Sequence, residues 1–75
     1  MRDEKLQISV GLRMKQKRIE KGYTQMEFAK KVGYTSKSTV SLIENGKRDI
    51  STSKYIKIAN ILGTSVDYLL GLEKK

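Results

Sequence analysis

The chain has 75 residues, with 16 lysines and arginines against 8 aspartates and glutamates, which gives a formal net charge of +8. It contains no cysteine, histidine or proline, which excludes disulfides, thiolate metal sites and thiol nucleophiles and removes the commonest general base. The length fits one domain with a modest core, for which an all-helical bundle with local contacts is the most economical architecture.

Residues 1–7 are polar and mix charges, and we expect them to form a loose, flexible arm or a frayed first turn. They lack the apolar stretch of a signal peptide, and no apolar run is long enough to cross a membrane, so a cytoplasmic protein is expected. A first helix is predicted over residues 9–21, with Val10, Met14 and Ile19 facing inward.

A second helix is predicted over residues 25–32, where apolar residues repeat at helical spacing. Thr24 can cap this helix, and Glu27 three residues later completes a capping box. Gly33 can leave helical dihedrals without steric cost and so ends the helix. The inward positions share one face and are Phe28, Ala29 and Val32.

A third helix is predicted over residues 37–45, directly after a polar corner. Ser36 is a good N-cap for it, and Val40 and Ile43 are its expected buried positions. Two short helices this close, with the small Ala29 where they cross, predict a helix-turn-helix.

The last third of the chain predicts two more helices separated by glycine stops. Ile50 anchors the loop after Gly46, and Ser51 or Thr52 caps a helix over residues 53–62. Its apolar stripe comprises Tyr55, Ile58, Ala59 and Leu62. Ser65 caps a short fifth helix that turns Val66, Leu69 and Leu70 inward, and residues 72–75 are expected to fray.

The side-chain inventory argues against catalysis. The carboxylates are scattered along the chain, and none stands at metal-ligand spacing from another ligand. No base other than a lysine is available to activate a serine, and no glycine-rich phosphate loop is present. We therefore expect no enzyme activity, no catalytic residue, no metal site and no cofactor.

Several motifs stand in order over residues 8–71: Arg18, KGYTQ at 21–25, Ala29 with Gly33, STVS at 38–41, IENGK at 43–47 and LGTSVDYLL at 62–70. In these motifs the chain resembles the phage-repressor and Cro type of helix-turn-helix domain, also called the xenobiotic-response-element family. The turn is one residue longer than usual, and we place the extra residue at Tyr34 or Thr35. The resemblance implies a compact five-helix, all-α, lambda-repressor-like domain that binds double-stranded DNA.

The resemblance further implies that the start of the third helix reads bases in the major groove. Lys37 suits the guanine O6 and N7 acceptors, and Ser38 can bond to either kind of group. Leu42 can pack on a thymine methyl, inside the domain or against a partner chain. Ser41 and Thr39 are secondary candidates.

Phosphate contacts are expected at helix ends and in the following loop. The family's glutamine at the start of the second helix corresponds to Gln25, where the backbone N–H groups and the helix dipole favour an anion. The resemblance also gives Asn45, and the loop offers Lys47 and Arg48. For these two cations the alternative is an ordinary solvated surface charge.

Arg18 and Glu44 correspond to a pair that bridges the first helix to the end of the third helix in the family. Such a bridge would orient the third helix and neutralise a buried charge. The alternative is two unconnected surface groups, whose pairing contributes only about 0–1 kcal/mol.

The expected function is that of a small transcriptional regulator of repressor type, which binds a palindromic operator as a homodimer. Its half-sites would lie about one helical turn, roughly 34 Å, apart. The fifth helix and the segment around Leu69–Leu72 are the expected dimer surface, and the alternative is that Leu69 and Leu72 belong to the core. One alternative is an antitoxin-like module whose main partner is another protein. Another is association with acidic lipid or RNA through charge alone.

Overall fold

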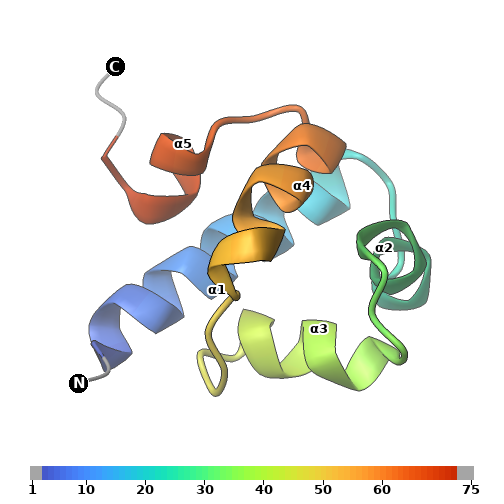
Figure 1. Ribbon diagram of the computed structural model, residues 1–75, viewed down its shortest axis with the longest axis horizontal. Helices are drawn as coiled ribbons and strands as arrows, with labels where there is room; N and C mark the ends of the chain where they lie inside the picture. The colour runs from blue at the N-terminus through green and yellow to red at the C-terminus, as the bar shows by residue number, and fades with distance from the viewer. Residues whose placement is uncertain (1–2, 73–75) are drawn as a thin grey trace.

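The computed structural model describes residues 3–72, which form five helices and no strand (Figure 1). The helices are α1 (Glu4–Glu20), α2 (Gln25–Val32), α3 (Lys37–Glu44), α4 (Thr52–Leu62) and α5 (Val66–Leu70). The predicted all-α, five-helix architecture is confirmed. The predicted bounds of the second helix match those of α2, and those of the third and fourth helices differ by one residue at one end.

The long helix α1 is the support on which the other elements are arranged. It contacts α3, α5 and α4, while α2 packs against both α3 and α4. In Figure 1, α3 lies along one side of the molecule. The α3–α4 loop leads into one end of α4, and α5 lies near the opposite end of that helix. The second and third helices therefore form a corner that is braced from behind by α1 and α4.

The start of α1 was predicted five residues too late. Asp3 caps the helix, because its side chain accepts a hydrogen bond of 3.1 Å from the Leu6 backbone N–H. Residues 4–7, expected in a loose arm, are therefore helical, and Gln7 is buried. Residues 1–2 and 73–75 of the predicted arm and frayed end lie outside the described residues.

The core is made of apolar side chains from all five helices and from the α3–α4 loop, where Ile50 is buried as predicted. Ile19 is the exception among the predicted inward residues, with 58% of its surface exposed. It follows Val10 by nine residues, or two and a half helical turns, and so lies on the opposite side of α1. The fully or nearly buried apolar residues are Val10, Met14, Phe28, Ala29, Val32, Val40, Ile43, Ile50, Ile58, Ala59, Leu62 and Leu69.

The close approach of α1 and α3 depends on a glycine that the sequence did not single out. A Cβ atom at Gly11 would collide with the backbone carbonyl oxygen of Ile43. Any larger residue would push α3 away from α1. Gly11 therefore sets the distance between α3 and the helix that supports it.

Candidate nucleic-acid interface

The outer side of α3 carries the residues predicted to read bases. Lys37 and Ser38 are exposed, and Leu42 exposes 42% of its surface, so it is not a core residue. Thr39 and Ser41 are half-buried. The opposite side of the helix is anchored by Val40 and Ile43, which expose 0% and 1%. The helix thus offers one polar, accessible side for contact with a partner.

The corner before α3 is a short, ordered turn from Gly33 to Ser36. Gly33 takes a left-handed conformation with φ of 97°, and the Tyr34 N–H donates to the Ala29 carbonyl at 2.9 Å. The Tyr34 ring packs on the core, where burial raises the pKa of its hydroxyl. Ser36 then caps α3 by accepting a hydrogen bond of 3.2 Å from the Ser38 N–H.

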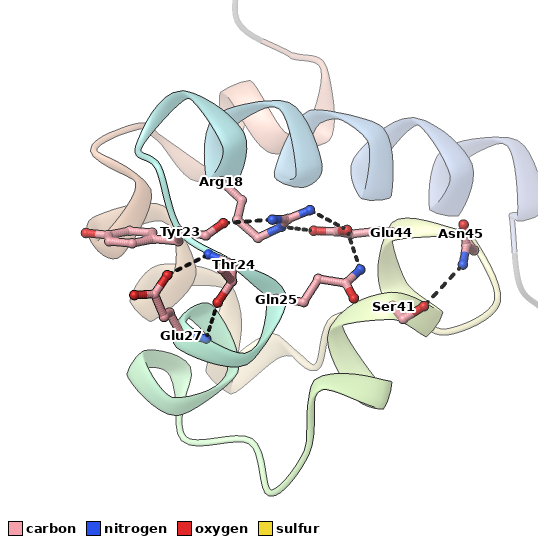
Figure 2. Close-up of polar contacts among 8 residues, drawn as sticks. All are labelled: Arg18, Tyr23, Thr24, Gln25, Glu27, Ser41, Glu44 and Asn45. Atoms are coloured by element: carbon pink, nitrogen blue, oxygen red, sulfur yellow. Dashed lines mark hydrogen bonds and ion pairs between the residues drawn. The ribbon is translucent and has the colours of Figure 1, made fainter.

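The far end of α3 is held by a buried polar network that joins three helices (Figure 2). Arg18 of α1 donates to both carboxylate oxygens of Glu44, with Nε–Oε2 at 2.6 Å and Nη2–Oε1 at 3.2 Å. Its Nη1 donates to the Tyr23 carbonyl at 2.7 Å. The predicted pair is therefore a buried ion pair, whose side chains expose 10% and 2%.

Gln25 belongs to the same network, which the sequence did not indicate. Its Nε2 donates to Glu44 Oε1 at 3.0 Å, across two helices and 19 positions of the chain. The sequence predicts Gln25 as a phosphate contact and Glu44 as half of an ion pair, with no link between the two. No local signal could have joined them, because the contact depends on how α2 and α3 cross.

The start of α2 has the predicted capping box. The Glu27 N–H donates to Thr24 Oγ1 at 3.1 Å, and the Thr24 N–H donates to Glu27 Oε1 at 2.8 Å. The backbone and side-chain hydrogen bonds with Thr24 hold the pKa of the Glu27 carboxyl below its ordinary value. The first backbone N–H groups of an α-helix have no partner within the helix, so this end suits an anion.

The remaining predicted phosphate contacts lie beside the end of α3. Asn45, Lys47 and Arg48 are all exposed. The Asn45 side chain donates to Ser41 Oγ at 3.4 Å, a long bond that leaves it close to the outer side of α3 (Figure 2). The structure therefore brings polar groups together at both ends of α3 and at the start of α2.

The predicted dimer segment is only partly available. Leu69 is fully buried in the core, so it cannot form an intermolecular surface, whereas Leu72 exposes 66%. This burial agrees with the inward position predicted for Leu69: α5 packs on α1 and α4, and Leu69 belongs to the core cluster. Exposed apolar residues elsewhere include Ile8, Leu12 and Ile56.

Two clefts border the start of α1. The larger has a volume of about 310 Å³ and lies between α1, the α3–α4 loop and Tyr55. Gln7 lines both clefts, and its buried Nε2 has no hydrogen-bond partner within residues 3–72. Over the same residues, no acidic side chains gather as a metal site would require, and no helix is long and apolar enough to cross a membrane.

Comparison with known proteins identifies proteins that are similar to this chain in sequence and in fold. The profile of the helix-turn-helix family HTH_3 matches residues 14–69. The HTH-type transcriptional regulator ImmR of Bacillus subtilis (strain 168) is 37% identical over 67 residues, which are 89% of this chain and 52% of ImmR. The chain therefore spans about half the length of that curated relative.

Two solved structures are similar over most of this chain. The clp gene regulator ClgR from Corynebacterium glutamicum matches with a TM-score of 0.80 and 27% identity, over 89% of this chain and 70% of ClgR. The restriction-modification controller protein C.AhdI from Aeromonas hydrophila matches with a TM-score of 0.78 and 27% identity, over 88% of this chain and 94% of C.AhdI. The predicted lambda-repressor-like fold is confirmed.

Proposed function

The chain belongs to the HTH_3 helix-turn-helix family of DNA-binding transcriptional regulators, and we propose that it is a small repressor that binds a specific double-stranded operator. The observation that carries the proposal is the exposed start of α3, where Lys37 and Ser38 stand on a helix whose other side is buried. A helix presented in this way can enter the major groove with its first residues against base edges.

Each base contact follows from side-chain chemistry. The Lys37 ammonium donates to the guanine O6 and N7 acceptors, and the Ser38 hydroxyl donates or accepts according to the base. Leu42 packs on a thymine methyl group, which its 42% exposure supports. Ser41 and Thr39 are half-buried and make secondary contacts at the margins.

Phosphate contacts fix the orientation of α3 in the groove. At the start of α2, the amide of Gln25 and the first backbone N–H groups bind one phosphate, aided by the helix dipole. Beyond the end of α3, the exposed Asn45, Lys47 and Arg48 bind the backbone on the other side. The excess of positive charge, +8 overall, favours this interface.

A palindromic operator has two equivalent half-sites and so requires two copies of the domain. We propose that the chain binds such an operator as a homodimer. Recognition helices of such dimers enter successive major grooves about 34 Å apart on one side of the duplex. Since Leu69 is buried, the exposed Leu72 and the half-buried Leu70 are the apolar side chains of this segment that we propose contribute to the dimer surface.

Selection of bound sequences from random duplex DNA, followed by titration against the selected and a scrambled duplex, tests the proposal. We expect a two-fold symmetric site and a clear preference for it over the scrambled duplex. The affinity should fall with salt at a logarithmic slope of about −5 to −9, as expected for six to ten neutralised phosphates. Equal affinity for both duplexes at every salt concentration would show that charge alone drives association.

A further inference from the structure

We propose that Glu44 is a positioning residue for DNA binding, which turns the side-chain amide of Gln25 so that an N–H group faces a backbone phosphate. The inference rests on the proposed function and concerns how one of its contacts is made. It assigns Glu44 a role that goes beyond its ion pair with Arg18.

The side chain of Gln25 is already held in the free protein. It is the first residue of α2, and its Nε2 lies 3.0 Å from Oε1 of Glu44, the last residue of α3 (Figure 2). Glu44 exposes only 4% of its surface, so its carboxylate has a fixed position. The Gln25 amide therefore reaches the proposed phosphate site from a defined direction.

The chemistry of the two groups decides which end of the amide faces Glu44. An ionised carboxylate only accepts hydrogen bonds, so the amide must offer its nitrogen. Nε2 carries two hydrogens, and within residues 3–72 only one of them has a partner. A phosphate oxygen also only accepts, so the second hydrogen of the same nitrogen can bind it. The reversed amide would set its carbonyl oxygen against both anions.

Arg18 makes the arrangement compatible with DNA. Glu44 alone would repel a phosphate, but the guanidinium of Arg18 bonds to both of its oxygens and balances its charge. The same guanidinium bonds to the Tyr23 carbonyl, two residues before Gln25. The network therefore fixes the backbone at the start of α2 as well as the side chain of its first residue.

The decisive variant is Glu44→Gln, which keeps the size of the side chain but adds an amide donor. The shorter Arg18 bond, from Nε to Oε2 at 2.6 Å, keeps the new oxygen at the Oε2 position, while the longer bond to Oε1 at 3.2 Å is lost. The new amide nitrogen then stands at the Oε1 position beside Gln25, which must turn its own oxygen toward it. The phosphate would meet a lone pair in place of a hydrogen. We expect affinity for the selected operator to fall about tenfold, the scale of one hydrogen bond to a charged group.

The direction of this change separates positioning from charge. Removal of a carboxylate near DNA should by itself strengthen binding, whereas the proposal predicts weaker binding. Glu20→Gln is the matched control, because it removes an exposed carboxylate of α1 whose one bonding partner among residues 3–72 is Lys17. We expect this control to bind the operator as well as the natural chain, or slightly better.

A double-mutant cycle with Gln25→Ala completes the test, with each variant titrated at a temperature where circular dichroism shows it folded. If Glu44 acts through Gln25, Glu44→Gln should weaken binding about tenfold in the natural background and hardly at all in the Gln25→Ala background. The Gln25 side-chain NH₂ resonances should shift on DNA addition in the natural chain and not in Glu44→Gln.

Independent effects of the two substitutions on affinity, or unchanged binding by Glu44→Gln, would overturn the positioning role. In that case the natural chain would still prefer its selected site, and the proposed function would stand. Failure of the natural chain to prefer any duplex would instead remove the proposed function, and the positioning role with it.

Discussion

The two ends of α3 are held in different ways. At its first turn Val40 is buried, the side-chain cap is one local hydrogen bond, from the Ser38 N–H to Ser36 Oγ, and Lys37 and Ser38 are exposed. Its last residue, Glu44, is 4% exposed and is bonded by residues of two other helices. The helix is therefore anchored at one end and presented at the other. Residues at the presented end can change without loss of the fold, which suits a surface that reads sequence.

The largest effect should come from breaking the anchored end. Arg18→Ala would leave the Glu44 carboxylate buried without its counter-charge, which typically costs about 3–5 kcal/mol of unfolding free energy. Urea denaturation measures the loss, and the exposed Lys15→Ala is a control that should change stability by less than about 0.5 kcal/mol.

The cycle of Arg18→Ala, Glu44→Ala and the double variant sharpens this result. Since either single change leaves one buried charge unpaired, the double variant should lose clearly less stability than the sum of the singles. Small, additive losses would mean that the ion pair does not anchor α3.

Substitutions at the exposed start of α3 should lower DNA affinity and leave stability nearly unchanged, in contrast to those at its buried end. Lys37→Ala is expected to lower affinity for the selected operator by about 1–3 kcal/mol, since it removes a base contact, while the unfolding free energy changes by less than about 0.5 kcal/mol. Titrations against single-base variants of the operator should show relaxed discrimination at one position. Uniformly weaker binding to all sequences would instead make Lys37 a phosphate contact.

The same contrast explains how much could be read from the sequence. Caps such as Thr24, Ser36 and Ser65 were predicted correctly, because each acts on backbone groups two or three residues away. The inward face of α2 followed from helical spacing. Such features are local, and the fold built from them was predicted almost completely.

Features that depend on how helices cross could not be predicted in the same way. The bond between Gln25 and Glu44 and the contact of Gly11 with Ile43 join distant positions, and no spacing rule connects them. The resemblance supplied the pairing of Arg18 with Glu44, but not the third member of the network. Leu69 was correctly predicted to face inward from helical spacing, but that its burial removes it from the expected dimer surface follows only from the packing of α5 on α1 and α4.

A smaller effect is expected from the cap of the presented end. Ser36→Ala removes the acceptor for the Ser38 N–H and should cost about 1 kcal/mol of unfolding free energy. Thr35→Ala, one residue earlier in the same turn, is the control, because the Thr35 side chain makes no hydrogen bond within residues 3–72. Chemical denaturation of both variants measures the difference. Equal losses would mean that the side-chain cap contributes nothing to this end of α3.

The smallest effect concerns the cap of α2, next to the anchored end. Because hydrogen bonds with Thr24 lower the pKa of Glu27 from its ordinary value of 4.5, its carboxylate adds stability that is complete above that value and is lost as the pH falls through the lowered pKa. Glu27→Gln keeps an acceptor for the Thr24 N–H but cannot titrate. The Tm of this variant should therefore fall slightly less than the Tm of the natural chain as the pH is lowered. Thermal unfolding monitored by circular dichroism gives the slope of Tm against pH for the variant and for the natural chain. NMR titration of the Glu27 carboxyl gives its pKa directly. Parallel slopes, or a carboxyl that titrates at its ordinary value, would mean that the charge of Glu27 does not support α2, and that the Thr24 cap and the Arg18–Glu44–Gln25 network hold the start of that helix without it.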